Sequence, residues 1–330
     1  MRVRQISFTG VGRVAVTEAE VREDPGDGEV LIAVSHVGIC GSDLAVLGGH
    51  HPWTRPPVVT GHEVSGHVLA TGPGAHRLQP GDRVVLNPLR ACGSCARCRQ
   101  GAVNQCESAA VRGYRLPGAA MTRLVVPERE LHRVPPQVPA ELACCAEPLA
   151  AAWHAAGRAS QLDEVAVIGA GSIGLLLLAA LRRRGAGPIT VIEPDRGKRE
   201  LARARGAGQA AAPGGLPPEP RFTAVFDCVC KPATLDWAGR AASAGGTVVA
   251  VGVPSGPVVI PLPRMQRYEV GLLGSGLYPP GDLDTGISLI AAQAVDVAGL
   301  ISGIYPLDRV AEAYARAGQA DSVKVLVAMP

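Results

Sequence analysis

The chain has 330 residues, enough for two domains of ordinary size. Hydrophobic residues make up 47% of it and charged residues 18%, which excludes a disordered chain. A net charge of +3 and an aromatic content of 3% argue against nucleic acid and a membrane surface as partners.

The N-terminus carries no recognisable secretion signal, since residues 1–16 mix arginine with scattered apolar residues. The most apolar segment, Ile173–Leu181, is shorter than the roughly 20 residues that cross a bilayer. Both observations predict a cytoplasmic protein without a membrane anchor. In such a protein, the clustering of nine cysteines predicts metal chemistry rather than disulfide bonds.

Short apolar runs separated by glycine, proline and aspartate dominate the first ninety residues. The runs are Val30–Val34, Val64–Ala70 and Arg83–Leu86. This spacing predicts short strands in a compact, β-barrel-like domain. The first run leads into Cys40–Asp43, where a thiol, a hydroxyl and a carboxylate lie within four residues.

Four cysteines follow within fifteen residues, separated by two, two and seven residues: Cys92, Cys95, Cys98 and Cys106. Four thiolates complete a tetrahedron around Zn²⁺, so the spacing predicts a closed, structural zinc site in a lobe of about residues 90–108. An iron–sulfur cluster is the alternative, because the first three cysteines have ferredoxin spacing. In ferredoxins, however, the next cysteine comes about four residues later, whereas Cys106 comes eight residues after Cys98.

A second candidate metal site is dispersed along the chain. Cys40, His62 and Glu147 offer one sulfur, one nitrogen and one oxygen, with Glu63 as a further carboxylate. Three protein ligands and one open position are the arrangement of a catalytic zinc. Each residue alone also fits a structural role, such as a turn histidine or a carboxylate at a helix start. Their combination with the cysteine lobe and a nucleotide-binding loop favours the catalytic site.

The second half of the chain opens with a dinucleotide-binding pattern. A buried strand, Glu164–Ile168, runs into Gly169–Gly174 with the sequence Gly-Ala-Gly-Ser-Ile-Gly, and a helix, Leu175–Arg184, follows. The N-terminus of this helix offers N–H groups to phosphates, at Ser172 and Ile173 among others.

Each of the three glycines in this loop is needed for a different physical reason. Gly169 permits the tight turn, Gly171 lets the pyrophosphate approach the backbone, and Gly174 lets the helix pack closely on the strand. Further along, Gly252 follows a strand and would allow a cofactor to approach the backbone in the same way.

Glu193 bears on the choice of dinucleotide. It follows the strand Ile189–Ile192 and lies nineteen residues after Gly174, close to the spacing of about 20 expected for a ribose-binding carboxylate. A carboxylate there would repel a 2′-phosphate, so we expect NAD rather than NADP. NADP remains open because basic residues follow closely, at Arg196, Lys198 and Arg199.

The alternation of strands and helices continues to residue 274. Strands are predicted at Ala224–Cys228, Thr247–Val251 and Val270–Gly274, the last at a sheet edge, and a helix at Ala233–Ser243. Residues 210–221 are rich in alanine, proline and glycine and predict a loop in place of a crossover helix.

These motifs resemble the zinc-containing medium-chain dehydrogenase/reductase family. The match runs from about Glu29 to the C-terminus and includes Gly38–Asp43, Gly61–Glu63, the four-cysteine lobe, Glu147–Ala150 and Gly169–Gly174. Within the family the chain is similar to polyol, threonine and aminocyclitol dehydrogenases, because a glutamate precedes Pro148 where liver-type alcohol dehydrogenases carry cysteine.

The resemblance implies an α/β fold in which a Rossmann-type, doubly wound parallel sheet joins a mainly β, GroES-like catalytic domain with a structural zinc lobe. The catalytic domain would comprise residues 1–148 and 282–330, its C-terminal strands returning to the N-terminal barrel. Residues 149–281 would form the dinucleotide-binding domain. The resemblance also implies an active-site cleft between the domains, and homodimers or homotetramers.

The resemblance also implies roles for the site residues. Cys40 and His62 would bind a catalytic zinc, with Glu63 and Glu147 sharing the remaining protein coordination. Asp43 would orient His62, fixing its tautomer.

Ser42 would hydrogen-bond the substrate hydroxyl and pass its proton outward. The chain departs from the family at Ala45, where many relatives carry the histidine at the outer end of the proton relay. His50 and His51 are candidates for the missing group. The loops Leu47–Pro57 and Arg112–Met121 are expected to line the pocket, with His50, Arg55 and Arg115 as candidate substrate contacts.

The function implied is the reversible, NAD-linked oxidation of a small secondary alcohol (a polyol, cyclitol or amino alcohol) to a ketone, with two zinc ions per chain. Two alternatives differ from it in their metal content or activity. One is a zinc-free enone or quinone reductase of the same fold, and the other is a nucleotide-binding protein without turnover.

Overall fold

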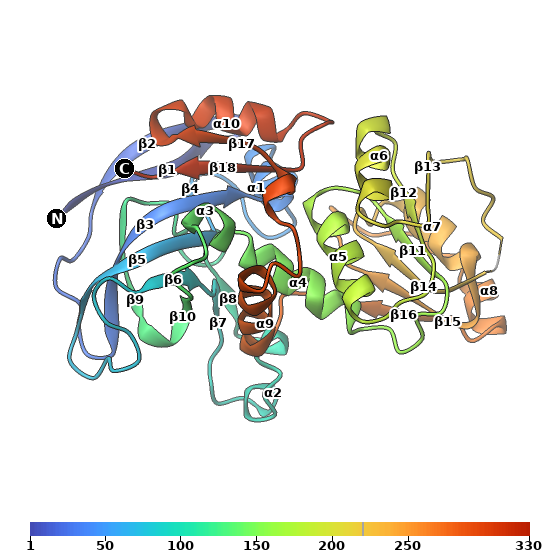
Figure 1. Ribbon diagram of the computed structural model, residues 1–330, viewed down its shortest axis with the longest axis horizontal. Coiled ribbons are helices and arrows are strands. Elements are labelled where there is room, and N and C mark those ends of the chain that lie inside the picture. Colours follow the sequence, from blue (N-terminus) through green and yellow to red (C-terminus); the bar gives the residue numbers. More distant parts are fainter. Residues whose placement is uncertain (220) are drawn as a thin grey trace. The chain divides into compact units, whose positions relative to one another are not determined.

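The structure is a computed structural model that describes residues 1–219 and 221–330 (Figure 1). It divides into two compact units. Unit 1 consists of Met1–Ala150 and Tyr278–Pro330, and unit 2 consists of Ala151–Leu277.

Unit 1 is built around a seven-stranded sheet. Its strand order is β10 (Leu131–Val134), β6 (Arg83–Leu86), β5 (Glu63–Thr71), β3 (Glu29–Ile39), β18 (Lys324–Ala328) and β17 (Ile301–Pro306), and β9 (Arg123–Pro127) also pairs with β3. Unit 1 also contains two smaller sheets. One has three strands in the order β2 (Arg13–Glu20), β1 (Arg2–Gly10) and β4 (Val58–Val59), and the other pairs β7 (Leu89–Arg90) with β8 (Ala110–Val111). The C-terminal strand β18 pairs antiparallel with β3, so the predicted return of the C-terminal strands to the N-terminal sheet is confirmed.

Aliphatic side chains fill the core of unit 1, as the low aromatic content requires. β3 is rich in valine and isoleucine, and β5 contributes Val64 and Val68; these residues favour strands because their branched side chains pack well on a pleated surface. An edge-to-face pair, Phe8 and Tyr314, adds one aromatic contact, with ring centroids 5.3 Å apart.

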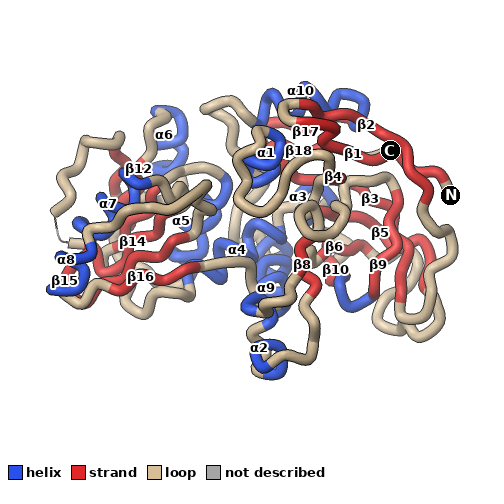
Figure 2. Tube along the Cα trace, turned by 180° about the vertical axis from the view of Figure 1, so that it is seen from behind, coloured by secondary structure: helices blue, strands red, loops and turns tan. Residues whose placement is uncertain are grey.

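The helices of unit 1 are short. They are α1 (Gly41–Leu47), α2 (Ala96–Arg99), α3 (Ala140–Ala143), α4 (Ala146–Ala156, which continues into unit 2), α9 (Pro280–Ala291) and α10 (Val310–Ala317), with 3-10 turns at Val103–Gln105, Glu128–Glu130, Ala298–Leu300 and Leu307–Arg309. α10 packs on β17, β18 and β2 (Figure 1). The segment around α2 projects from the strands of unit 1 in both views (Figure 2).

Unit 2 contains a six-stranded sheet in which every neighbouring pair is parallel. The strand order is β13 (Gln209–Ala211), β12 (Ile189–Ile192), β11 (Val165–Ile168), β14 (Phe222–Asp227), β15 (Ala242–Ala250) and β16 (Gly271–Gly274). Counted along the chain this is the order 3-2-1-4-5-6 of a doubly wound dinucleotide-binding sheet. The helices are α5 (Ser172–Arg183), α6 (Arg196–Ala204), α7 (Pro232–Ala241) and α8 (Leu262–Arg267).

The predicted elements of unit 2 are confirmed in type and order, with differences at their ends. β16 lies at the predicted sheet edge. Residues 210–211 belong to strand β13 rather than to a loop, because they pair with β12, and residues 212–219 then run to β14 without a helix. Pro220, within the predicted loop, lies outside the described residues. Among the described helices, each is too short or too polar to cross a membrane.

Candidate active site and metal centres

Cys40 lies between β3 and α1, at a turn fixed by Asp43. The backbone N–H of Cys40 donates to Asp43 Oδ2 at 2.9 Å, which satisfies one of the free groups at this helix start. Thr60 Oγ1 donates to the other oxygen, Asp43 Oδ1, also at 2.9 Å. Asp43 is 1% exposed, so this carboxylate ties the turn that carries Cys40 to the strand that leads to His62.

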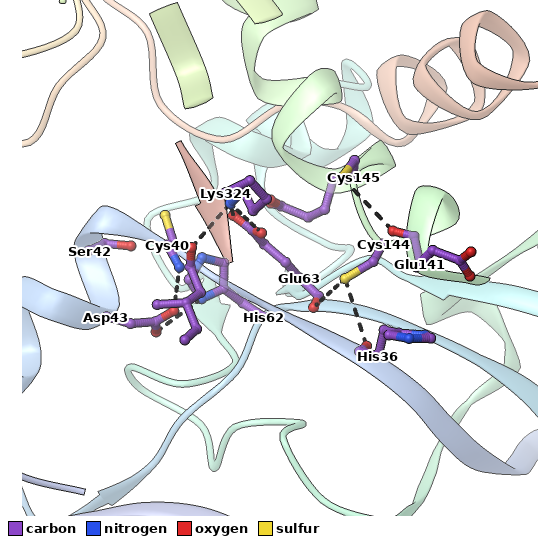
Figure 3. A network of polar contacts seen from close by, with 12 residues as sticks. His36, Cys40, Ser42, Asp43, His62, Glu63, Glu141, Cys144, Cys145 and Lys324 are labelled. Carbon is purple, nitrogen blue, oxygen red and sulfur yellow. Dashed lines mark hydrogen bonds and ion pairs between the residues drawn. The ribbon is translucent and has the colours of Figure 1, made fainter. Parts of the chain in front are cut away.

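The structure brings Cys40, His62 and Glu63 together (Figure 3). One ligand atom from each lies within 4.8 Å of the other two. Glu63 opens β5 directly opposite Gly38 on β3. A Cβ at Gly38 would lie 2.0 Å from Glu63 Oε2, so glycine is required there for the carboxylate to reach the cluster.

Lys324 is a member of this cluster that the sequence did not reveal. Its Nζ donates to both carboxylate oxygens of Glu63 at 2.7 Å and to the carbonyl of Ile39 at 3.2 Å (Figure 3). Lys324 and Glu63 are 2% and 1% exposed. Burial disfavours the ammonium form, but the charge and hydrogen bonds of Glu63, together with the nearby Cys40 and Cys145, outweigh burial and raise the pKa of Lys324 above its ordinary value.

Glu147 lies on α4 and is also buried, but outside the three-atom group of Cys40, His62 and Glu63. Its Oε1 accepts a hydrogen bond from Tyr278 Oη at 2.9 Å. Burial raises the pKa of Glu147 to about 7, and proximity to His62 opposes that shift. Tyr278 was another contact that the sequence did not reveal, since it follows a loop and carries no motif.

His62 and Asp43 are neighbours without a hydrogen bond. His62 Nδ1 lies 3.6 Å from Asp43 Oδ1, which is longer than an ordinary hydrogen bond, and this buried nitrogen has no other partner among the described residues. Burial disfavours the imidazolium, but Asp43 and Cys40 outweigh burial and raise the pKa of His62. The orientation of His62 by Asp43 stays a prediction.

The donor set fits a zinc ion. It offers sulfur, nitrogen and oxygen, the three kinds of atom that bind zinc in proteins. The carboxylates of Asp43, Glu63 and Glu147 are all buried around this donor set, and Lys324 pairs with Glu63. Buried carboxylates are costly without compensating charge, which a divalent cation would supply.

Ser42 contacts a side chain that the sequence did not single out. Tyr114 Oη donates to Ser42 Oγ at 2.5 Å. Tyr114 lies in the loop expected to line the pocket, beside Arg115, which is exposed. His50 is also exposed, and Arg55 donates to the carbonyls of His51 and Thr54.

The four-cysteine lobe gathers Cys92, Cys95, Cys98 and Cys106, whose sulfur atoms all lie within 4.8 Å of one another. Backbone N–H groups point at the sulfurs: Cys95 N lies 3.3 Å from Cys92 Sγ, and Cys98 N lies 3.5 Å from Cys95 Sγ. The N–H groups of Ser94 and Cys95 lower the pKa of Cys92 to about 6. Four sulfurs with such support fit a tetrahedral metal with no open position.

The glycine-rich loop follows β11, beside the point where the strand order reverses between β11 and β14. Gly169 has φ +93°, and a Cβ at Gly174 would lie 1.9 Å from the Gly169 carbonyl oxygen, so both positions require glycine. A Cβ at Gly171 would meet open space, and α5 begins at Ser172, followed by Ile173. In open α/β sheets, ligands bind outside the carboxyl ends of the strands at this reversal.

Glu193 joins this loop from the end of β12. Its Oε2 accepts from Ala170 N at 2.7 Å and its Oε1 accepts from Asp195 N at 2.9 Å. Among the nearby basic residues, Arg199 donates to the carbonyl oxygens of Glu193 and Pro194. A Cβ at Gly252 would lie 2.8 Å from the carbonyl oxygen of Cys228, so this glycine packs closely against the backbone. Contact between Gly252 and a cofactor stays a prediction.

Two family models match the chain. Residues 26–136 match the alcohol dehydrogenase GroES-like domain, and residues 172–292 match the zinc-binding dehydrogenase model. The chain is 31% identical over 316 residues to 2-dehydro-3-deoxy-L-galactonate 5-dehydrogenase of Pseudoalteromonas atlantica, covering 92% of both chains. The chain belongs to the zinc-binding dehydrogenase family.

Solved structures of similar proteins agree with this assignment. A protein described as a zinc-binding dehydrogenase of Sinorhizobium meliloti, bound to NADP, matches with a TM-score of 0.91 and 29% identity over 99% of both chains. An alcohol dehydrogenase (rspB) of Escherichia coli, in complex with NADH, matches with a TM-score of 0.90 and 27% identity over 99% of both. The predicted family, the two-part fold and the assignment as a zinc-dependent oxidoreductase are therefore confirmed.

Proposed function

We propose that this zinc-binding dehydrogenase catalyses the reversible, NAD-linked oxidation of a secondary alcohol to a ketone. The observation that carries the proposal is the cluster of half-buried Cys40 with buried His62 and Glu63, with Ser42 at the helix start beside Cys40. Unit 1 is the catalytic domain in this proposal, and unit 2, with its glycine-rich loop on a 3-2-1-4-5-6 sheet, is the dinucleotide-binding domain.

Two zinc ions per chain are proposed. Cys40 and His62 hold the catalytic ion, with Glu63 and Glu147 sharing the remaining protein coordination. The four cysteines of the lobe hold the structural ion. When bound, the catalytic zinc supplies a Lewis acid that lowers the pKa of an alcohol hydroxyl, and the dinucleotide supplies the hydride acceptor.

The chain's own residues position the alcohol and move its proton. Ser42 Oγ accepts the proton of the alcohol and releases its own proton to water. Asp43 holds the turn that carries Cys40 and faces His62 Nδ1, which favours one orientation of that ring. Lys324 forms a buried ion pair with Glu63, its Nζ lying 2.7 Å from the carboxylate, and so offsets the cost of burying that side chain.

NAD is the proposed cofactor, held by Gly169, Gly171, Ser172, Ile173, Gly174, Glu193 and Gly252. The carboxylate of Glu193 is anchored to the loop through Ala170 N, where it would repel a 2′-phosphate. Of the basic residues that would favour NADP, Arg199 is bonded to backbone carbonyls and Arg196 to Glu200. One similar structure contains NADP and another NADH, so the preference for NAD in this proposal depends on Glu193 of this chain.

The proposed substrates are hydroxylated alcohols, including sugar acids and polyols, with cyclitols and amino alcohols as further members of the class. Two observations support this class: a relative named for a dehydro-deoxy-galactonate, and exposed cationic residues such as Arg115 in the loop that carries Tyr114. An arginine suits a carboxylate because it can donate two parallel hydrogen bonds.

A homodimer or homotetramer in the cytoplasm is the proposed state of the protein. β16 ends the sheet of unit 2 and exposes Leu272 by 43% and Leu273 by 36%. An edge strand with apolar side chains is a surface on which a second copy can pair. All nine cysteines are free thiols, which favours a reducing compartment.

The test is a metal analysis combined with a substrate panel. The purified protein should contain two zinc ions per chain and should produce NADH absorbance with at least one sugar acid, polyol, cyclitol or amino alcohol, at a higher kcat/KM with NAD than with NADP. Reduction of enones or quinones by protein that retains no zinc would instead assign it to the zinc-free reductases.

A further inference from the structure

Tyr114 contacts the residue that handles the substrate proton in the proposed function. The two residues are 72 positions apart in the sequence, and the Tyr114 hydroxyl donates to Ser42 Oγ at 2.5 Å. Ser42 is the second residue of α1, two residues after Cys40. The contact therefore brings a loop after β8 onto the helix start that carries the candidate zinc ligand.

Tyr114 packs against two histidine rings. Its ring lies flat on the imidazole of His51, with centroids 4.7 Å apart and planes 3° apart, and it lies 5.4 Å from the His62 ring. Two residues before it, Arg112 is buried and donates to Glu130 Oε2 from Nε at 3.2 Å and from a terminal nitrogen at 2.9 Å. A phenol stacked in this way has little freedom to turn away from Ser42.

The same region contains Ala45, the position at which the chain departs from its family. The carbonyl of Ala45 accepts from His50 N at 2.8 Å and from His51 N at 3.1 Å. His51 is 3% exposed. The turn after α1 thus places the imidazole of His51 against Tyr114, so an aromatic pair stands next to Ser42 in a chain without the usual histidine at position 45.

Hydrogen-bond chemistry shows what the Tyr114 contact does to Ser42. A serine hydroxyl has one hydrogen to donate and two positions at which to accept. A phenol is protonated near neutral pH and so donates, which fills one accepting position of Ser42 Oγ. The second position remains for the proton of the alcohol, and Ser42 keeps its own hydrogen for donation to water. A donated hydrogen bond also polarises the Ser42 O–H and makes it a better donor.

We propose that Tyr114 is a positioning residue for the dehydrogenation, because its hydroxyl fixes the rotation of the Ser42 hydroxyl that receives the substrate proton. The proposal rests on the proposed function of Ser42. The proton balance is simple: the alcohol O–H bond breaks, Ser42 Oγ gains that proton, and the original Ser42 proton leaves to water. Tyr114 keeps its own proton throughout.

The test is the zinc-loaded Tyr114→Phe enzyme, which retains the stacked ring and loses the hydroxyl. We expect kcat to fall about three- to tenfold, the factor that one ordinary hydrogen bond supplies, with the KM for NAD unchanged. In a Ser42→Ala background the same change should cost nothing further, because the group it positions is gone. Tyr268→Phe, which removes an exposed phenol in unit 2, is the matched control and should leave kcat unchanged.

A proton NMR signal gives a readout that does not depend on turnover. The short Tyr114–Ser42 hydrogen bond should produce a resonance downfield of the amide protons that disappears in Tyr114→Phe and in Ser42→Ala but persists in Tyr268→Phe. An unchanged kcat in Tyr114→Phe, or an equal loss in both Ser42 backgrounds, would overturn the proposal. Failure of the proposed function is distinct: wild-type protein would then show the resonance but oxidise no alcohol.

His51 offers a second variant with a graded expectation. His51→Phe keeps a flat ring against Tyr114 and should retain a higher kcat than His51→Ala, which removes the stacking partner and should reproduce part of the Tyr114→Phe loss. Equal activity of the two variants would show that stacking does not hold Tyr114, and would overturn that part of the proposal.

Discussion

The two candidate metal centres of unit 1 are built in opposite ways. The lobe takes all four sulfurs from fifteen consecutive residues and supports them with its own backbone N–H groups. The cluster around Cys40 draws on the ends of β3, β5 and β18, and Lys324 lies 285 residues from Ile39, whose carbonyl it contacts. The lobe projects from the strands, with Cys92 exposed, whereas His62, Glu63 and Lys324 are buried.

The difference shows what each kind of site requires from the chain. Thiolates near the surface need a few N–H groups and a metal, which a short loop can supply. A buried carboxylate needs an opposite charge at contact distance, and the chain supplies it from its C-terminal strand. Substituting a ligand of the lobe should therefore destabilise the lobe alone. Substituting a residue of the cluster should affect turnover or the stability of the whole domain.

The largest effect is expected for Cys40→Ser. Replacing the sulfur ligand should lower kcat by about 10³-fold or more, because the Lewis acid is lost or misplaced, while NAD binding stays within a few-fold. Steady-state kinetics and NAD titration measure the two effects. Cys145→Ser, a buried thiol near the cluster, is the control and should retain turnover. Near-normal kcat in Cys40→Ser would contradict a catalytic metal at this site.

Some residues of the two metal centres could be predicted from the sequence, and others could not. The lobe and the glycine-rich loop were predictable because spacing along the chain sets their geometry. Cys40 and His62 were identified by their ligand types and by the family motifs Gly38–Asp43 and Gly61–Glu63. Lys324, Tyr278 and Tyr114 were not identified. Each reaches the site through strand pairing or loop packing, which no local pattern in a single sequence encodes.

Lys324→Met should have the largest effect on stability. The change leaves Glu63 buried without its cation, and breaking such a pair costs about 3–5 kcal/mol in the free energy of unfolding. Denaturant unfolding measures the loss. Adding Glu63→Gln should restore part of it, because the unpaired charge is removed as well. Lys231→Met, at an exposed lysine, is the control and should change stability by less than about 0.5 kcal/mol. A loss no larger than in the control would show that water or another group compensates Glu63.

Cys95→Ser should have a smaller effect on stability, confined to the lobe. We expect the zinc content to fall by about one ion per chain and the free energy of unfolding to fall by about 2 kcal/mol, which corresponds to a melting temperature lower by several degrees. Turnover per remaining active site should stay close to normal. Calorimetry and metal analysis provide the measurements. If the zinc content and melting temperature stay at wild-type values, the lobe does not hold a structural metal through this residue.

The smallest effect is expected at Glu193 and concerns the choice of cofactor. This residue shares one property with the lobe and another with the buried cluster. Like the cysteines of the lobe, Glu193 could be predicted from its spacing along the chain. Like the residues of the cluster, it is buried (7% exposed), and two backbone N–H groups anchor its carboxylate. Glu193→Gln keeps the shape of the side chain and removes its charge, so the ratio of kcat/KM for NAD to that for NADP should fall about tenfold, the value of one charge-assisted hydrogen bond. Glu193→Ala should lower the ratio at least as much and also loosen the loop at Ala170, since both anchoring bonds are lost. If Glu193→Gln leaves the ratio unchanged while Glu193→Ala lowers it, the geometry of the carboxylate rather than its charge selects the dinucleotide.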